Sequence, residues 1–274
     1  MIRDITIGQY YPADSKIHKL DPRTKLICTF FFIISLFVSS SVSGYIMATL
    51  FLAAAITASK VPLKYILKGL KPIIIILFIT VGFNLFLTRE GRVIFDFWIF
   101  TITDKGLKLA VFMAFRLIYL IMGSSVMTFT TTPNSLTDGI ESVLHPLNKI
   151  KVPVHEIAMM MTIALRFIPI LLEETDKIMK AQTARGADFE SGNIIHRAKS
   201  MIPILVPLFV SAFRRATDLA MAMEARCYRG GDGRTKMKPL KYKKTDVTVY
   251  IIMAVYFVSM CTIARMFPLH IWIF

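Results

Sequence analysis

The feature that most constrains this chain is a set of apolar runs that approach the thickness of a lipid bilayer. They fall at about 25–40, 44–59, 72–88, 107–130 and 247–267. A helix needs roughly 20 apolar residues to cross a hydrocarbon core of about 30 Å, so several runs are near the short limit. Hydrophobic residues make up 55% of the 274 residues, and the mean hydropathy is +0.58. The sequence therefore predicts an all-α membrane protein with about five transmembrane helices.

Basic residues in the segments between these runs predict their orientation, because short positively charged segments stay in the cytoplasm. Five Lys and Arg precede or begin the first run, and "SKVPLKYILKGLKP" adds four lysines without an acid. By contrast, "TREGRVIFDFWIFTITDK" balances three basic residues against three acidic ones. Five crossings then place the N-terminus in the cytoplasm and the C-terminus outside the cell.

The chain divides into a membrane region with four crossings over 1–130, a cytoplasmic coupling region over 131–244, and a final transmembrane helix within 245–274. The middle region is mixed in composition and holds 18 of the 33 Lys and Arg. It predicts one shorter helix and two long ones, over about 134–148, 154–186 and 194–229.

The two long helices follow a common pattern. In the first, apolar residues from Ile157 to Leu172 recur at i, i+3, i+4 and i+7, and Gly186 is a stop signal. In the second, Pro203 and Pro207 predict a kink, and Gly230 follows a polar final third. Each helix is apolar first, then amphipathic, and then ends at an arginine among small residues.

The residues at the two helix ends are Ala184, Arg185 and Gly186 in "KAQTARGADF", and Ala225, Arg226 and Cys227 in "MAMEARCYRGG". One interpretation is ordinary, because basic residues near helix C-termini interact favourably with the negative end of the dipole. The recurrence favours a second interpretation, in which each guanidinium enters a narrow acidic groove and binds a carboxylate through two hydrogen bonds. Two such tips would fit a partner with two similar docking sites.

Motifs of common catalytic sites are absent from the sequence. It has no GxxxxGK[ST] loop, no HExxH and no GxSxG, and its five histidines are scattered. The crossings contain almost no ionisable residues except Arg116, which is either functional or paired inside the bundle. From the residues alone we weigh a force-transmitting transport subunit, a stand-alone ion-coupled secondary carrier, and an intramembrane enzyme or lipid-binding scaffold. The lack of intramembrane carboxylates disfavours the carrier.

The two motifs, together with "ALRFIPILLEE" and the N-terminal "IHKLDPRTKL", resemble the transmembrane T components (EcfT) of energy-coupling factor (ECF) transporters, which are ABC-type transporters. The resemblance spans essentially the whole chain. Cys227 departs from it, since the second motif commonly has glycine there. The resemblance implies a non-catalytic, multi-pass subunit in the cell membrane of a prokaryote.

The resemblance also implies specific partners. Arg185 would dock into one ABC-type ATPase and Arg226 into another (EcfA and EcfA′), and those subunits, rather than this chain, would bind ATP and Mg²⁺. One membrane-embedded S component would bind a vitamin or other micronutrient and lie in a cradle formed by the coupling helices. No nucleic acid is expected as a partner. The residues expected to contact the S component are Met160, Met161, Leu165, Ile168, Leu205 and Phe209.

Overall fold

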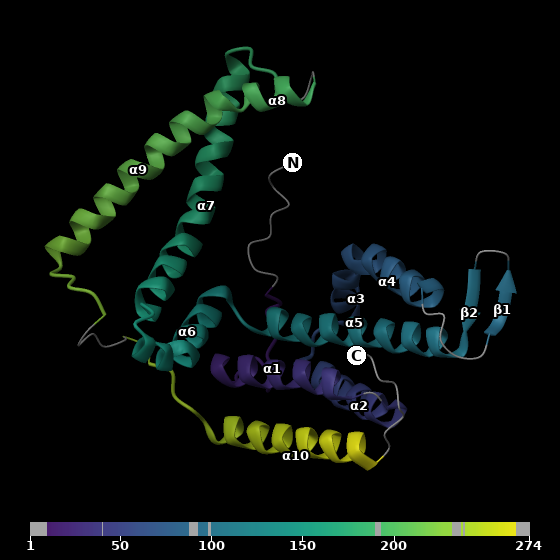
Figure 1. Cartoon of the computed structure of the whole chain (residues 1–274). Helices are drawn as coiled ribbons and strands as arrows, with labels where there is room; N and C mark the ends of the chain where they lie inside the picture. Colours follow the sequence, from purple (N-terminus) through teal and green to yellow (C-terminus); the bar gives the residue numbers. More distant parts are fainter. Residues whose placement is uncertain are drawn as a thin grey trace. The chain divides into compact units, whose positions relative to one another are not determined.

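The computed structural model describes residues 10–39, 41–87, 93–97, 100–189, 193–231, 237 and 239–266. Helices form nearly all of this structure (Figure 1), and the prediction of an all-α membrane protein is confirmed. The described residues fall into two compact units. One, here called the coupling unit, lies within Glu141–Pro239, and the other, the bundle unit, lies within Gly8–Ile140 and Leu240–Phe274.

Six helical segments of the described residues are long and apolar enough to cross a membrane. They are Val42–Ser59, Leu63–Leu85, Asp104–Thr130, Val154–Ala184, Ile195–Ala225 and Lys244–Met266. The two segments in the coupling unit have the lowest mean hydropathies, 1.6 and 1.2, against 1.7 to 2.1 for the others. Length and composition alone therefore do not separate the predicted crossings from the predicted coupling helices, and the number of crossings remains a prediction.

The bundle unit follows the predicted apolar runs and adds short elements between them. Its elements are α1 (Pro22–Val38), α2 (Val42–Ser59), α3 (Leu63–Leu70), the 3₁₀ turn η2 (Lys71–Ile73), α4 (Ile74–Leu87), β1 (Val93–Phe97), β2 (Phe100–Thr103), α5 (Asp104–Thr130), the first part of α6 (Pro133–Leu144) and α10 (Lys244–Met266). The sequence did not predict α3, which lies in the lysine-rich segment. It also did not predict the antiparallel β1–β2 hairpin, which leads into α5 through the N-cap Thr103.

Helices α1 and α5 organise the core of the bundle unit, since α5 packs against α1, α2, α3 and α4, while α1 also packs against α10. Leu36 is fully buried there, and the rings of Phe51 and Tyr256 stack with centroids 4.3 Å apart. Gly123 permits the close contact of α5 with α1, because a Cβ at this position would lie 2.6 Å from the Phe32 ring. These contacts bury the apolar faces that the helices share.

Two carboxylates join the beginnings of α1 and α10. Asp21 caps α1 by accepting a hydrogen bond from the backbone N–H of Arg23 at 2.9 Å. The fully buried Asp246 accepts from the backbone N–H of Asp21 at 2.9 Å and from that of Lys243 at 2.7 Å. The Arg23 guanidinium lies 3.9 Å from the centre of the Tyr242 ring. This network satisfies backbone donors that two helix N-termini would otherwise leave unpaired.

The coupling unit contains the 3₁₀ turn η3 (His145–Ile150), α7 (Val154–Ala184), α8 (Ile194–Ser200) and α9 (Ile202–Ala225). The predicted second long helix is therefore divided at Met201. Pro203 lies in the first turn of α9, where its missing N–H breaks no helical hydrogen bond, and Pro207 lies inside the helix. Pro169 likewise lies within a continuous α7.

Candidate functional site: two arginine-capped helix ends

Helices α7 and α9 form an antiparallel pair. The side-chain amide of Gln182 donates to the carbonyl of Pro203 at 3.4 Å, and Arg215 forms an ion pair with Glu174 at 3.4 Å. Residue numbers therefore rise along one helix as they fall along the other. Figure 1 shows the two helices close together near α8 and splayed apart towards the C-terminal end of α9. The unit thus has two arms that meet at one end.

The C-termini of both helices have the same hydrogen-bonding pattern. At the end of α7, the N–H of Gly186 donates to the carbonyl of Thr183 at 2.9 Å, and the N–H of Ala187 donates to that of Gln182 at 3.0 Å. This pair of bonds is the Schellman motif, which satisfies two of the last carbonyls of a helix. In both helices the arginine is the C-cap residue.

At the end of α9 the equivalent bonds run from Cys227 to Glu224 at 2.8 Å and from Tyr228 to Met223 at 3.0 Å. Arg185 has φ −89° and ψ 7°, and Arg226 has φ −93° and ψ 16°. The similarity of the two tips that the sequence suggested is therefore a similarity of backbone conformation as well as of residue type.

The residue after each arginine adopts a left-handed conformation, with φ 87° at Gly186 and φ 55° at Cys227. Glycine adopts this region without steric cost, whereas an L-residue loses roughly 1–2 kcal/mol. Cys227, where the resemblance led us to expect glycine, thus leaves the turn in place, at an energetic cost. Gly230 also has positive φ, at 94°, but it lies three residues beyond the turn.

Both arginine side chains are exposed and lack a partner in the described part of the chain. Neither takes part in an ion pair or side-chain hydrogen bond there. Arg185 lies one turn beyond Gln182, which contacts Pro203, and Arg226 lies 23 residues after Pro203 along α9. At about 1.5 Å per residue, the two tips are therefore roughly 35 Å apart.

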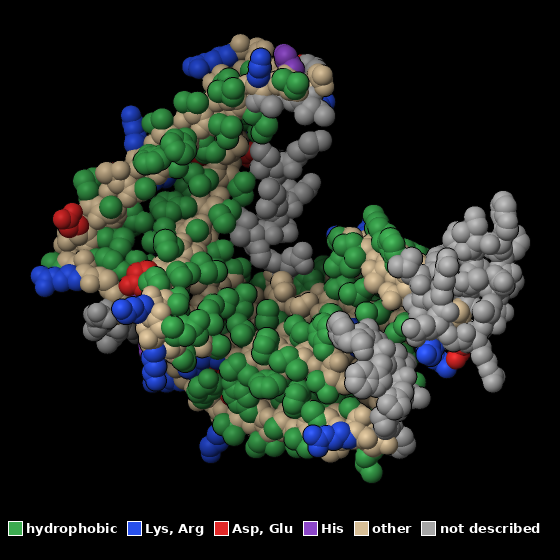
Figure 2. Space-filling view, in the orientation of Figure 1, with side chains coloured by type: hydrophobic (Ala, Val, Ile, Leu, Met, Phe, Trp, Pro, Cys, Tyr) green, Lys and Arg blue, Asp and Glu red, His purple; other side chains and the backbone are tan. Residues whose placement is uncertain are grey.

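An exposed apolar surface covers much of the two helices (Figure 2). Five of the six residues predicted to contact an S component are exposed, from 38% for Ile168 to 64% for Phe209, and Leu165 is half-buried. The structure adds further exposed apolar residues to this surface: Ile157 on α7, and Val206, Val210, Phe213 and Met221 on α9. Contiguous exposed apolar surface of this kind is typical of a protein or membrane contact.

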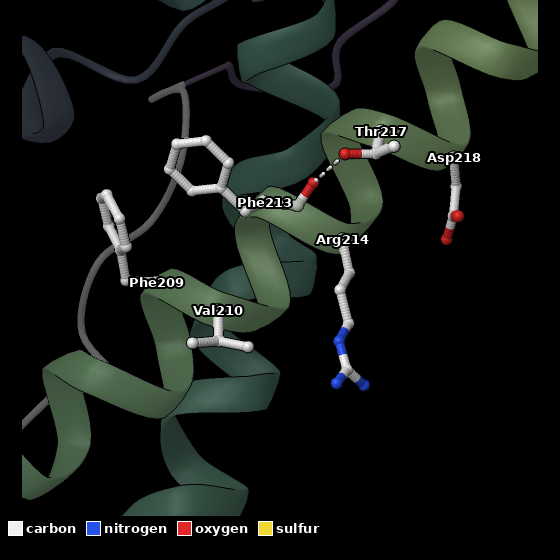
Figure 3. Close-up of a pocket in the computed structure, with 6 residues that line it drawn as sticks. All are labelled: Phe209, Val210, Phe213, Arg214, Thr217 and Asp218. Carbon is white, nitrogen blue, oxygen red and sulfur yellow. Dashed lines mark hydrogen bonds between the residues drawn. The ribbon is translucent and has the colours of Figure 1, made fainter.

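Part of this surface is hollowed on α9, where a depression of about 570 Å³ is lined by Phe209, Val210, Phe213, Arg214, Thr217 and Asp218. The rings of Phe209 and Phe213 have centroids 4.8 Å apart, and Arg214 and Asp218 point away from them (Figure 3). Our sequence prediction named only Phe209 of these six. The spacing of four residues between the two phenylalanines, which places them on one helix face, was the available signal.

The connection after α9 returns to the first turn of α7. The Nδ1 atom of His155 lies 2.8 Å from Glu141 Oε1, and a Cβ added at Gly231 would lie 2.6 Å from the His155 ring. The two neighbouring glycines therefore have different roles, since Gly230 supplies positive φ and Gly231 permits close contact. His155 thus connects the beginning of α7 with Glu141 and with the segment after α9.

Arg116 packs within the bundle unit. Its Nε donates to the Tyr45 hydroxyl at 3.3 Å, and its guanidinium lies 5.3 Å from the centre of the Phe37 ring. Of the two interpretations of this residue, the structure favours pairing inside the bundle. Within the described ranges, no three His, Cys, Asp or Glu side chains are grouped so that they could hold a metal ion.

The chain is similar in sequence to known membrane transport proteins. The family profile described as cobalt transport protein (CbiQ) matches residues 13–237. The energy-coupling factor transporter transmembrane protein EcfT of Ruminiclostridium cellulolyticum is 57% identical over 256 residues, which are 93% of this chain and 96% of that protein. EcfT of Clostridium kluyveri is 59% identical over 247 residues (90% and 92%), and EcfT of Bacillus subtilis is 48% identical over 255 residues (93% and 96%).

Proposed function

This chain belongs to the EcfT family of energy-coupling factor transporter transmembrane proteins, and we propose that it links ATP hydrolysis by two ABC-type ATPase subunits to the uptake of a vitamin or other micronutrient by an S component. It is a multi-pass membrane protein and a transport component. In this proposal the chain itself is not catalytic, and its partners bind ATP and Mg²⁺.

The observation that carries the proposal is the pair of equivalent tips. Each presents an exposed guanidinium from the C-cap of a Schellman motif, without a partner in the described residues. A planar guanidinium held between small neighbours fits a groove that contains a carboxylate, which it can bind through two parallel hydrogen bonds. Two tips of the same conformation fit two similar subunits, with Arg185 in one and Arg226 in the other.

The separation of about 35 Å supports a mechanical role. Because Arg185 lies where the two arms meet and Arg226 lies at the far end of α9, a rotation of one docked ATPase relative to the other would alter the angle between α7 and α9. The arms meet over the contacts of Glu174 with Arg215 and of Gln182 with Pro203. Motion at the tips would therefore be transmitted to the helix faces that carry the exposed apolar residues.

Those faces are the proposed contact for the S component. Met160, Met161, Leu205 and Phe209 are each more than 40% exposed, and unbranched methionine side chains adapt to varied surfaces. In the proposed arrangement this cradle lies near the membrane, the tips lie in the cytoplasm, and the chain has a cytoplasmic N-terminus and an external C-terminus.

The test is co-purification of the ATPases with this chain from membranes. Buried interfacial arginines commonly contribute 2 kcal/mol or more, so we expect Arg185→Glu and Arg226→Glu each to weaken docking by about 30-fold or more, and the double variant to abolish it. The matched control is Lys180→Glu with Arg229→Glu. It makes the same change in charge at exposed positions near the two tips.

The control variant should retain both ATPases, and all variants should insert into the membrane to the same extent. Retention of both ATPases by the Arg185→Glu/Arg226→Glu protein would contradict the docking proposal. Equal loss in the control would mean that general surface charge, and not the two tips, holds the partners.

A further inference from the structure

The bundle unit contains an elongated cavity of about 630 Å³ that the proposed coupling function does not use. It lies among α1, α2, α5, α10 and the segment before α1, and its walls are largely apolar. The volume is within the range of roughly 300–1,000 Å³ that is typical of small-molecule sites. Two lysines, Lys16 and Lys25, are among its lining residues, and no acidic residue is.

Both lysines mark one end of this cavity. The Nζ atom of Lys25 lies 2.7 Å from the carbonyl oxygen of Thr130 and 3.2 Å from that of His18. The lining residue Thr130 is the last residue of α5, and Lys16 lies in the segment that precedes α1. This end is where α1 and α10 begin and where α2 and α5 end.

From there the cavity extends into the apolar interior. On α5 its lining runs back from Thr130 to Gly123, seven residues or about 10 Å of helix. Phe32 and Phe51 line the deeper part, while the small side chain of Ala55 leaves room between α2 and its neighbours. The cavity is therefore cationic where the helices start and end and apolar towards the middle of the bundle.

The state of Lys25 points to an anionic ligand. The residue is only 7% exposed, and an ammonium group has three N–H donors. The described residues supply it with two neutral carbonyl acceptors and no ion pair. The carboxylates of Asp21 and Asp246 attract Lys25, but burial of the cation outweighs this attraction, so an anion at the mouth of the cavity would stabilise this arrangement. The exposed Lys16 offers a second positive charge beside it.

We propose that this cavity binds one anionic phospholipid, with an acyl chain between α1, α2, α5 and α10 and its phosphate at Lys16 and Lys25. The polarity of the cavity matches the direction of a lipid in a bilayer, whose headgroup lies at the helix ends and whose chain lies towards the membrane centre. Ala54 and Ala58, on the exposed side of α2, leave a route of entry that small side chains keep open.

Native mass spectrometry of the purified full-length chain, incubated with phosphatidylglycerol or phosphatidylethanolamine, tests the proposal. Ala55→Phe fills the cavity and should lower phosphatidylglycerol binding at least tenfold. The matched control is Ala53→Phe, which adds the same side chain to an exposed position of α2 outside the cavity and should leave binding unchanged. Lys16→Gln should reduce the preference for phosphatidylglycerol over phosphatidylethanolamine by about fivefold.

Ala58→Phe, at an exposed position at the cavity's edge, provides a second filling variant if Ala55→Phe fails to fold, and it should show the same loss. Equal phosphatidylglycerol binding by the filling variant and Ala53→Phe would overturn the proposed site. A wild-type chain without preference for the anionic lipid, or a preference that Lys16→Gln leaves intact, would overturn the role of the lysines.

Discussion

Substituting the residue that follows each arginine tests whether the backbone conformation of that residue determines how stably the helix end is folded. Gly186 has φ 87° and has no atom within 4 Å of the position a Cβ would take. Gly186→Ala therefore introduces backbone strain without a steric clash. Cys227 already bears this strain at φ 55°, and Cys227→Gly removes it.

The strain of roughly 1–2 kcal/mol for an L-residue is partly offset because glycine gains about 0.5–1 kcal/mol of conformational freedom when the turn opens. We therefore expect a net change of about 1 kcal/mol at each turn, destabilising for Gly186→Ala and stabilising for Cys227→Gly. A change of this size corresponds to about a fivefold change in the equilibrium for local opening.

Amide hydrogen exchange measured at the two turns reads this equilibrium directly. The amides of Ala187 and Tyr228 close the longer bond of each Schellman motif, so their protection reports opening of the turns. Protection should fall about fivefold at Ala187 in Gly186→Ala and rise about fivefold at Tyr228 in Cys227→Gly. Cys227→Ala, which changes the side chain while the residue remains chiral, should leave protection nearly unchanged. Equal protection in Cys227→Gly and Cys227→Ala would refute the assignment of strain to the backbone.

Three further predictions concern the contacts that hold the two units in their folds. Asp246→Ala leaves the buried N–H of Asp21 and the partly buried N–H of Lys243 without their acceptor and should lower the free energy of unfolding by about 3 kcal/mol in thermal denaturation. Burial acts to raise the pKa of Asp21, but hydrogen bonds from Arg23 outweigh it and lower that pKa below the ordinary 3.8. The ionised Asp21 therefore contributes fully to stability above about pH 4, and this contribution is lost as the pH falls through the lowered pKa. Asp21→Asn should reduce the loss of stability at acidic pH. Gly231→Ala places a methyl group 2.6 Å from the His155 ring, and limited proteolysis should then cleave the segment after α9 faster, whereas a Gly82→Ala control with open space around it should not be cleaved faster.

The positions of the long helices were predictable because apolar runs determine them. The run at about 44–59 lies within α2, and the run at about 107–130 lies within α5, which begins three residues earlier at Asp104. The earlier start has a local cause. The Thr103 hydroxyl accepts from the N–H of Gly106 at 3.1 Å and caps the helix before the apolar residues begin.

The shorter elements could not be predicted from the sequence because tertiary contacts stabilise them. Helix α3 has eight residues, too few for an isolated helix to be stable in water, and the fully buried Ile66 ties it to the bundle core. The second long helix is interrupted at Met201, whereas the sequence analysis placed this interruption too late, at Pro203 and Pro207. A proline disrupts the chain before it, whereas Pro203 itself fits the first turn of α9.

The equivalence of the two tips was predictable from the arginines and their small neighbours, but its physical basis was not. Sequence comparison treats Cys227 as a departure from the glycine at the equivalent position, Gly186. The backbone shows that both residues occupy the left-handed region and donate the same hydrogen bond. A residue can therefore differ in type from the motif and still adopt the motif's backbone conformation, at a cost of roughly 1–2 kcal/mol.

The position of the arginines at helix C-caps bears on why the proposed docking would require arginine. The last carbonyls of α7 and α9 carry partial negative charge, so an acidic groove approaching a bare helix C-terminus would be repelled. A guanidinium at the C-cap neutralises this end and can also bind the approaching carboxylate with two parallel hydrogen bonds. A lysine would supply the charge but not the planar pair of donors. Since the Schellman bonds already satisfy the carbonyls of Thr183 and Gln182, and of Glu224 and Met223, the arginine side chains remain available to a partner instead of closing their own helices.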